Sequence, residues 1–141
     1  MNSKQITSRL KSIKSFQGVC ARDVLPKKFN KPASLVANTD SRNQEGEHWV
    51  AFYITKNRTE YFDPLGFPPL GKSLTSFVYR NTRKRYYFSC KALQNSGSTL
   101  CGKYCIAFIK HRASGKSYVS FINKFSRNSN KNDILIRSKS I

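Results

Sequence analysis

The sequence predicts a single α+β domain, and three observations lead to that prediction. The chain has 141 residues, which is the usual size of one domain. With 38% hydrophobic and 13% aromatic residues it can bury a core, so wholesale disorder is not expected. The hydrophobic patterns run in the order helix, strand cluster and further helices, which is typical of α+β proteins. We therefore expect one domain over residues 1–141.

The first half of the chain carries the first helix and most of the strands. Ile6, Leu10 and Ile13 recur at helical spacing, which predicts an amphipathic helix over 3–15, with a break at Gly18. A proline-marked loop follows. Runs rich in β-forming residues, separated by polar turns at 40–47 and 56–58, then predict strands over 34–39, 48–55 and 59–63.

The second half is mainly helical in pattern. Apolar spacing predicts a short helix over 72–82 and a buried helix over 101–112, with a strand over 85–90 between them. A further helical stripe is formed by Tyr118, Phe121, Ile122 and Phe125. Residues 127–141 are polar and basic, and we expect them to form a flexible tail.

The charge of the chain is extreme and uneven. There are 26 basic and 7 acidic residues, a net charge of +19. Residues 1–70 hold 11 basic against 6 acidic side chains, net +5, whereas 71–141 hold 15 against the single Asp133, net +14. Such a field attracts polyanions, of which nucleic acid is the commonest. No base-reading motif is present, so we expect backbone-directed DNA binding.

The cysteine pattern and the apolar runs exclude several other classes. No Cys-x-x-Cys pair occurs among the cysteines at 20, 90, 101 and 105, so we expect no metal site. No apolar run approaches the ~18 residues of a membrane span, and the N-terminus does not resemble a secretory signal. We expect an intracellular monomer without a disulfide framework.

Four residues at the ends of predicted elements suggest thiol chemistry. Cys101 begins a helix, whose positive end stabilises a thiolate. His48 at a strand start is a candidate base, and Asp63, at the matching end of the hairpin, could orient it; Glu60 is a weaker alternative. Gln94 could hold an oxyanion together with the Cys101 backbone N–H.

Each of these residues also has a purely structural interpretation. A lone histidine or cysteine is more often a packing residue, an Asp before Pro is usually a turn residue, and a loop Gln is usually solvated. Cys105 lies on the apolar face and is expected in the core. His111, ten residues after Cys101 on the same helix, should point away from it and receives no catalytic role.

The segments "GEHWVAFYI", "YFDPLGF" and "QNSGSTLCGKYC" resemble the adenovirus-type maturation cysteine proteases (adenain) and their Maverick/Polinton relatives. The resemblance extends over about 16–112. It implies a papain-like or SUMO-protease-like fold, with a central mixed sheet and the nucleophile-bearing helix packed against it. By position, it implies that His48, Asp63, Gln94 and Cys101 are the catalytic histidine, acid, oxyanion glutamine and nucleophile.

The family resemblance also implies substrates and activators. It implies cleavage of precursor capsid and core proteins in the virion and host nucleus, with stimulation by DNA and by a short peptide. Cys90 stands near the position of the cysteine that links this peptide, but the spacing to Gln94 is shorter here, and a buried strand thiol is the other interpretation. Two other functions remain open, a deconjugating isopeptidase acting on ubiquitin-like proteins and a non-enzymatic basic DNA-packaging protein.

Overall fold

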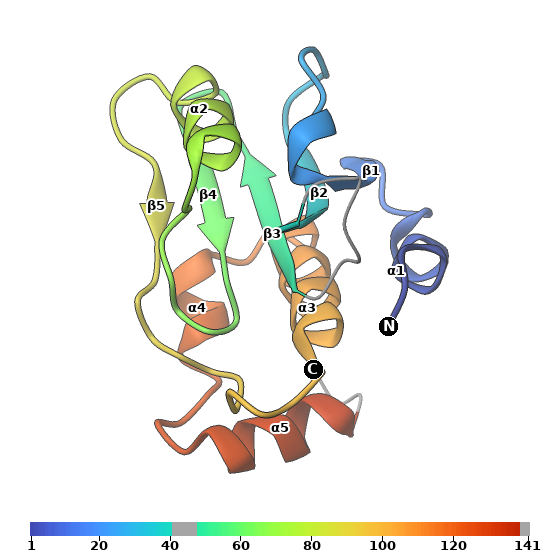
Figure 1. Ribbon diagram of the computed structural model, residues 1–141, viewed down its shortest axis with the longest axis vertical. Coiled ribbons are helices and arrows are strands. Elements are labelled where there is room, and N and C mark those ends of the chain that lie inside the picture. The colour runs from blue at the N-terminus through green and yellow to red at the C-terminus, as the bar shows by residue number, and fades with distance from the viewer. Residues whose placement is uncertain (41–47, 139–141) are drawn as a thin grey trace.

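A five-stranded mixed sheet lies at the centre of the computed structural model, which describes residues 1–40 and 48–138 (Figure 1). The strands are β1 (Phe16–Ala21), β2 (Ala33–Asn38), β3 (Trp49–Ile54), β4 (Thr59–Phe62) and β5 (Tyr87–Phe88). The helices are α1 (Ser3–Leu10), α2 (Lys72–Arg80), α3 (Cys101–Ala113), α4 (Tyr118–Ile122) and α5 (Ser129–Arg137), with a 3₁₀ turn η1 (Arg22–Val24). In the part of the chain described, no helix has the length and apolarity to cross a membrane.

The strands lie in the order β1-β2-β3-β4-β5. The central pairs β2–β3 and β3–β4 are antiparallel, while the outer pairs β1–β2 and β4–β5 are parallel. The antiparallel pairing of β3 with β4 places the start of β3 and the end of β4 at the same edge of the sheet. The predicted α+β class and central mixed sheet are confirmed.

Both faces of the sheet are buried, so the molecule has three layers. Alternate side chains of β3 point to opposite faces: Ala51 and Tyr53 join the core beneath α1, α3 and α4, whereas Val50, Phe52 and Ile54 join the core beneath α2. On the α3 face, Phe62 of β4 stacks on Phe108 with ring centroids 4.8 Å apart. This packing holds α3 against the strands that carry the candidate residues.

The first helix is shorter than predicted, and a strand was missed. Helix α1 ends at Leu10, and residues 16–21 form β1 instead of a helix end and a breaker. Gly18, which the sequence suggested as a break, lies inside β1 at φ 136°, where the register with β2 is irregular. Glycine tolerates this backbone conformation, which other residues rarely adopt, so it marks a bulge here.

The predicted flexible tail is wrong for most of its length. Residues 129–137 form α5, capped by Asn128, whose side chain accepts the backbone N–H of Lys131. Asn132, Asp133 and Ile136 of this helix are buried. The strand expected over 85–90 shrinks to β5 at residues 87–88. The turn predicted over 40–47 lies, beyond its first residue, outside the described part of the chain.

Candidate active site

The β3–β4 hairpin brings His48 and Asp63 together, as the sequence predicted. His48 directly precedes β3 and Asp63 directly follows β4. The His48 Nε2 atom lies 2.8 Å from Asp63 Oδ1. The Asp63 side chain is 6% exposed and the His48 side chain is 19% exposed, so the pair is shielded yet open to a reactant.

Asp63 also organises the loop that follows it. Its Oδ1 atom accepts the backbone N–H of Leu65 at 2.8 Å, and its carbonyl accepts the N–H of Gly66 at 2.8 Å. A carboxylate that accepts several hydrogen bonds is held in one orientation. Asp63 therefore stabilises the Asp-Pro-Leu-Gly turn and contacts His48 at the same time. Its interpretation as a turn residue and its functional interpretation are compatible.

Cys101 is the first residue of α3 and is buried. Burial raises the pKa of its thiol, but a hydrogen bond from His48, the backbone N–H groups of Trp49 and Gly102 and the positive charge of His48 outweigh burial, and the pKa falls below its usual value. The positive end of the helix acts in the same direction. His48, Asp63 and Cys101 thus form one connected set.

The pKa of His48 moves in the opposite direction. Burial lowers it, but hydrogen bonds to Asp63 and Cys101 and the charges of both partners raise it to about 9. Because Nε2 faces Asp63, Nδ1 is the ring nitrogen left for the thiol. The two shifts favour a thiolate beside an imidazolium, which is the reactive state of a cysteine nucleophile.

The other three cysteines have different surroundings. Burial raises the pKa of Cys20 to about 11, and burial together with nearby negative charge raises that of Cys105. Cys105 is fully buried, as expected for a core residue. Cys90 is exposed and lies beyond β5, so its interpretation as a buried strand thiol is wrong. Within the described residues, no group of three or more His, Cys, Asp or Glu side chains could hold a metal ion.

Gln94 is linked to the Asp63–His48–Cys101 set by backbone hydrogen bonds to Pro64, the residue after Asp63. The N–H groups of Leu93 and Gln94 both donate to the carbonyl of Pro64, at 2.9 and 3.0 Å. The Gln94 side chain is buried, and its Nε2 donates to the Ser98 carbonyl at 2.9 Å. An amide nitrogen carries two hydrogens, so one remains for another acceptor. The structure positions Gln94 beside the loop that leads to Cys101, with its amide bonded to that loop.

Helix α5 braces the backbone on either side of Gln94, and sequence reasoning missed this. The Tyr104 hydroxyl donates to Asp133 Oδ1 at 2.7 Å, and the same oxygen accepts the Asn95 N–H at 3.4 Å. Asn132 Nδ2 donates to the carbonyl of Leu93 at 3.1 Å. Asp133 is the single acid among residues 71–141. A single acidic residue within a strongly basic segment suggests that it has a specific partner. This was the signal in the sequence that could have identified Asp133.

Two other polar residues have partners elsewhere. Glu60, the weaker candidate acid, is buried and binds Arg112 Nε at 2.6 Å and Arg58 at 3.2 Å, so it does not orient His48. The His111 Nε2 atom lies 2.9 Å from the Ser117 carbonyl and 2.8 Å from Ser120 Oγ. His111 thus ties α3 to α4, in agreement with its lack of a predicted catalytic role.

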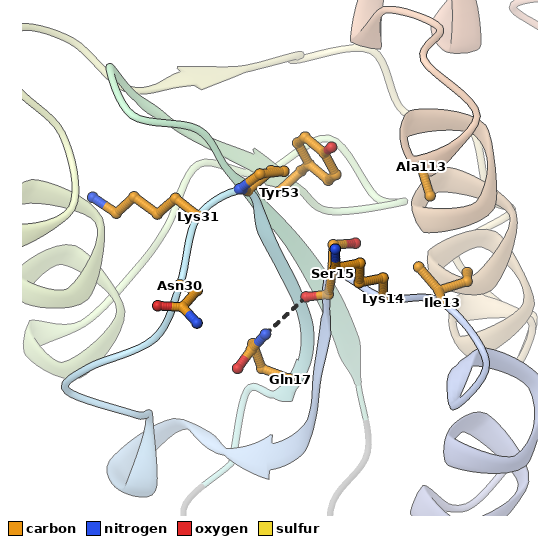
Figure 2. A pocket seen from close by; sticks show the side chains of 9 residues that line it. Ile13, Lys14, Ser15, Gln17, Asn30, Lys31, Tyr53 and Ala113 are labelled. Atoms are coloured by element: carbon orange, nitrogen blue, oxygen red, sulfur yellow. Dashed lines mark hydrogen bonds between the residues drawn. The ribbon is translucent and has the colours of Figure 1, made fainter.

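A separate cavity of about 610 Å³ lies at the opposite end of the sheet from Cys101. Figure 2 shows Tyr53 from the end of β3, Ala113 from the end of α3, and Lys14 and Lys31 from the loops that precede β1 and β2. Gln17 donates to the Ser15 carbonyl at 3.1 Å within it. Among the residues that the structure describes, no acidic side chain and none of the candidate catalytic residues lines this cavity.

Comparisons with known proteins find viral proteases of similar sequence. The chain is 32% identical over 111 residues to the protease of human adenovirus D serotype 9, covering 68% of this chain and 50% of that protein. It is 31% identical over 110 residues to the protease of human adenovirus B serotype 3, covering 68% and 49%. The chain is therefore related in sequence to the adenovirus-type proteases. It spans about half the length of these adenoviral relatives. No protein-family model matches it.

The fold of the chain also matches solved structures. A crystal structure of the ASFV pS273R protease gives a TM-score of 0.63 at 20% identity, covering 93% of this chain and 63% of that one. A selenomethionine structure of the same protein gives 0.52 at 25% identity, covering 70% and 40%. The expected SUMO-protease-like fold of this chain is therefore confirmed.

Proposed function

We propose that this chain is a viral or virus-like cysteine endopeptidase that cleaves precursor capsid and core proteins during virion maturation. The observation that carries the proposal is the connected set of Asp63, His48 and Cys101, in which the pKa of the thiol is lowered and that of the imidazole is raised. The similarity to adenoviral proteases supports it. Perturbed pKa values of two partners in contact are typical of catalytic pairs.

In the proposed reaction the Cys101 thiolate attacks the carbonyl carbon of the scissile bond. The tetrahedral oxyanion accepts hydrogen bonds from the Cys101 N–H and from the Gln94 amide, which has one hydrogen beyond its bond to Ser98. His48 gives its proton to the leaving amine, and the C–N bond breaks to leave a thioester. Water, deprotonated by His48, then hydrolyses the thioester, which releases the carboxylic acid product and regenerates the Cys101 thiolate beside the His48 imidazolium. Asp63 holds the imidazole throughout.

Alkylation of the individual cysteines tests the nucleophile directly. At neutral pH, iodoacetamide is expected to modify Cys101 well before Cys20, whose pKa is about 11, because only the thiolate reacts. At pH 7 a thiol with that pKa is ionised in only ~1 of 10⁴ molecules. Mass spectrometry of the peptides gives the rate at each cysteine. Exposed Cys90 is the reference for an accessible thiol.

His48→Ala completes the labelling test. It should slow the modification of Cys101 at neutral pH, because the imidazolium no longer stabilises the thiolate. If Cys101 reacts no faster than Cys90 and His48→Ala changes nothing, the protease function is wrong. A basic DNA-packaging protein with an inert protease fold would then be the better interpretation.

DNA is a proposed activator, and the net charge of +19 supports it. Lys14 and Lys31 in the cavity far from Cys101 are cations that a phosphate could reach without blocking the active site. Peptide cleavage measured with and without duplex DNA should rise on adding DNA, and the effect should fall steeply between about 50 and 200 mM salt. A DNA effect that does not respond to salt would contradict polyanion binding.

A peptide activator attached through Cys90 is also proposed, and the exposure of that thiol supports it. Action in the virion and host nucleus follows from the same proposed role. A deconjugating isopeptidase is the alternative for the same catalytic set. Cleavage of a ubiquitin-like conjugate, with no cleavage of capsid precursor peptides, would favour that alternative.

A further inference from the structure

A hollow of about 330 Å³ opens beside His48 and Asp63, and the proposed reaction leaves it unexplained. Phe67 and Leu70 of the loop after β4 line it at the surface and are 54% and 61% exposed. Tyr61 and Leu74, which are buried, also line it. Arg22, the first residue of η1, and Asp40, which follows β2, add polar groups.

The position of the hollow indicates which part of a substrate would enter it. It is lined by His48 and Asp63, but not by Cys101, Trp49 or Gln94. In the proposed reaction His48 protonates the leaving amine, so the peptide that carries this amine must pass on the histidine side. That peptide is the segment on the C-terminal side of the cut. The acyl half stays on Cys101 and lies on the other side of the histidine.

The loop that carries Phe67 and Leu70 is held in place before any substrate binds. It starts from Asp63, whose side chain and carbonyl bind the next two N–H groups of the loop. Gly66, at φ 82°, packs so closely that a Cβ there would lie 2.7 Å from the Cys90 carbonyl oxygen. Phe67 and Leu70 form the rim of the hollow, and the Asp63 carboxylate that orients His48 also fixes their loop. Because the loop is already ordered, the rim can select among substrates without an entropic cost of ordering.

We propose that this hollow is a subsite for the substrate residues on the C-terminal side of the cut, and that Phe67 and Leu70 make it select an apolar side chain. The inference rests on the proposed protease function and adds specificity to it. Two large apolar side chains beside a catalytic pair lose contact with water when an apolar group covers them. Because His48 itself lines the hollow, the selected side chain is expected within the first three residues after the cut, a span of about 10 Å in an extended peptide.

The test compares peptides that carry Leu or Ser at each of the first three positions after a Gly–Gly cut site. The wild-type chain should show a kcat/KM about tenfold higher for Leu than for Ser at one of these positions. Phe67→Ser and Leu70→Ser should each reduce this Leu/Ser ratio, and the double variant should bring it to within about twofold of unity. Val119→Ser and Ile134→Ser, at 52% and 65% exposure on α4 and α5, are matched controls that should keep the ratio.

An aryl ester of Gly–Gly has a leaving group that carries no residue beyond the cut. Its turnover tests the protease function separately from the subsite. Turnover of the ester and the peptides with the same rate for Leu and Ser would overturn the subsite alone. A Leu/Ser ratio that both rim variants leave intact would do the same. Absence of turnover of both ester and peptides would overturn the protease function and the subsite with it. Because the Leu/Ser ratio is taken within each variant, partial loss of folding does not affect it.

Discussion

Cys101→Ala is expected to reduce peptide cleavage to the background rate, a fall of about a millionfold if the triad acts as one unit. The reason is chemical, since alanine has no atom that can form the thioester. The substitution places a good helix former at the first position of α3, so the fold should persist. The rate is measured by peptide cleavage, and folding by thermal denaturation.

Two further variants sharpen the test of Cys101. Cys20→Ala removes another partly buried thiol outside the proposed site and should retain cleavage. His48→Ala should cost nearly as much as Cys101→Ala, and the double variant should be no slower than either, because residues that act together are not additive. Equal activity of wild type and a folded Cys101→Ala chain would remove Cys101 as the nucleophile.

Asp63→Ala is expected to lower kcat by roughly 10³–10⁴-fold, because it removes the group that orients His48 at 2.8 Å. It should also narrow the pH profile of kcat/KM. In the wild type, the imidazolium is present below about pH 9 and is lost as the pH rises through that value. Without Asp63 the pKa of His48 falls, so activity should decline at a lower alkaline pH.

The acid side of the pH profile should move in the other direction. Cys101 becomes a thiolate as the pH rises through its lowered pKa, and part of that lowering comes from the charge of His48. When His48 loses its proton more easily, the pKa of Cys101 rises. The acidic and alkaline limbs of the bell-shaped pH profile should therefore lie closer together in Asp63→Ala than in the wild type.

Asp63→Asn separates orientation from charge. An amide oxygen can still accept the His48 Nε2 hydrogen and the Leu65 N–H, but it carries no negative charge. This variant should retain more activity than Asp63→Ala while its alkaline limb still moves to lower pH. An alkaline limb that stays in place in both variants would show that Asp63 does not set the pKa of His48.

Several parts of the fold followed from local patterns. The alternation in β3 and β4 and the apolar spacing in α3 were strong, so the hairpin and the nucleophile-bearing helix were predicted close to their observed bounds. Strand β1 was missed because its glycine suggests a break, and only its pairing with β2 shows that it is a bulge. Helix α5 was missed because a basic, polar segment has weak periodicity, and its buried face is defined by its partners.

The sequence by itself determined the order of chemical groups: a histidine before a strand, an acid after its hairpin partner, a glutamine in a loop and a cysteine at a helix start. Those positions depend on local periodicity and turn residues, which are encoded within a few residues. Only the tertiary structure decided that Asp133 and Tyr104 brace the Gln94 segment, that Glu60 belongs to Arg112, and that Cys90 is exposed. These facts depend on contacts between residues far apart in the chain, and such contacts leave no periodic signal in the sequence.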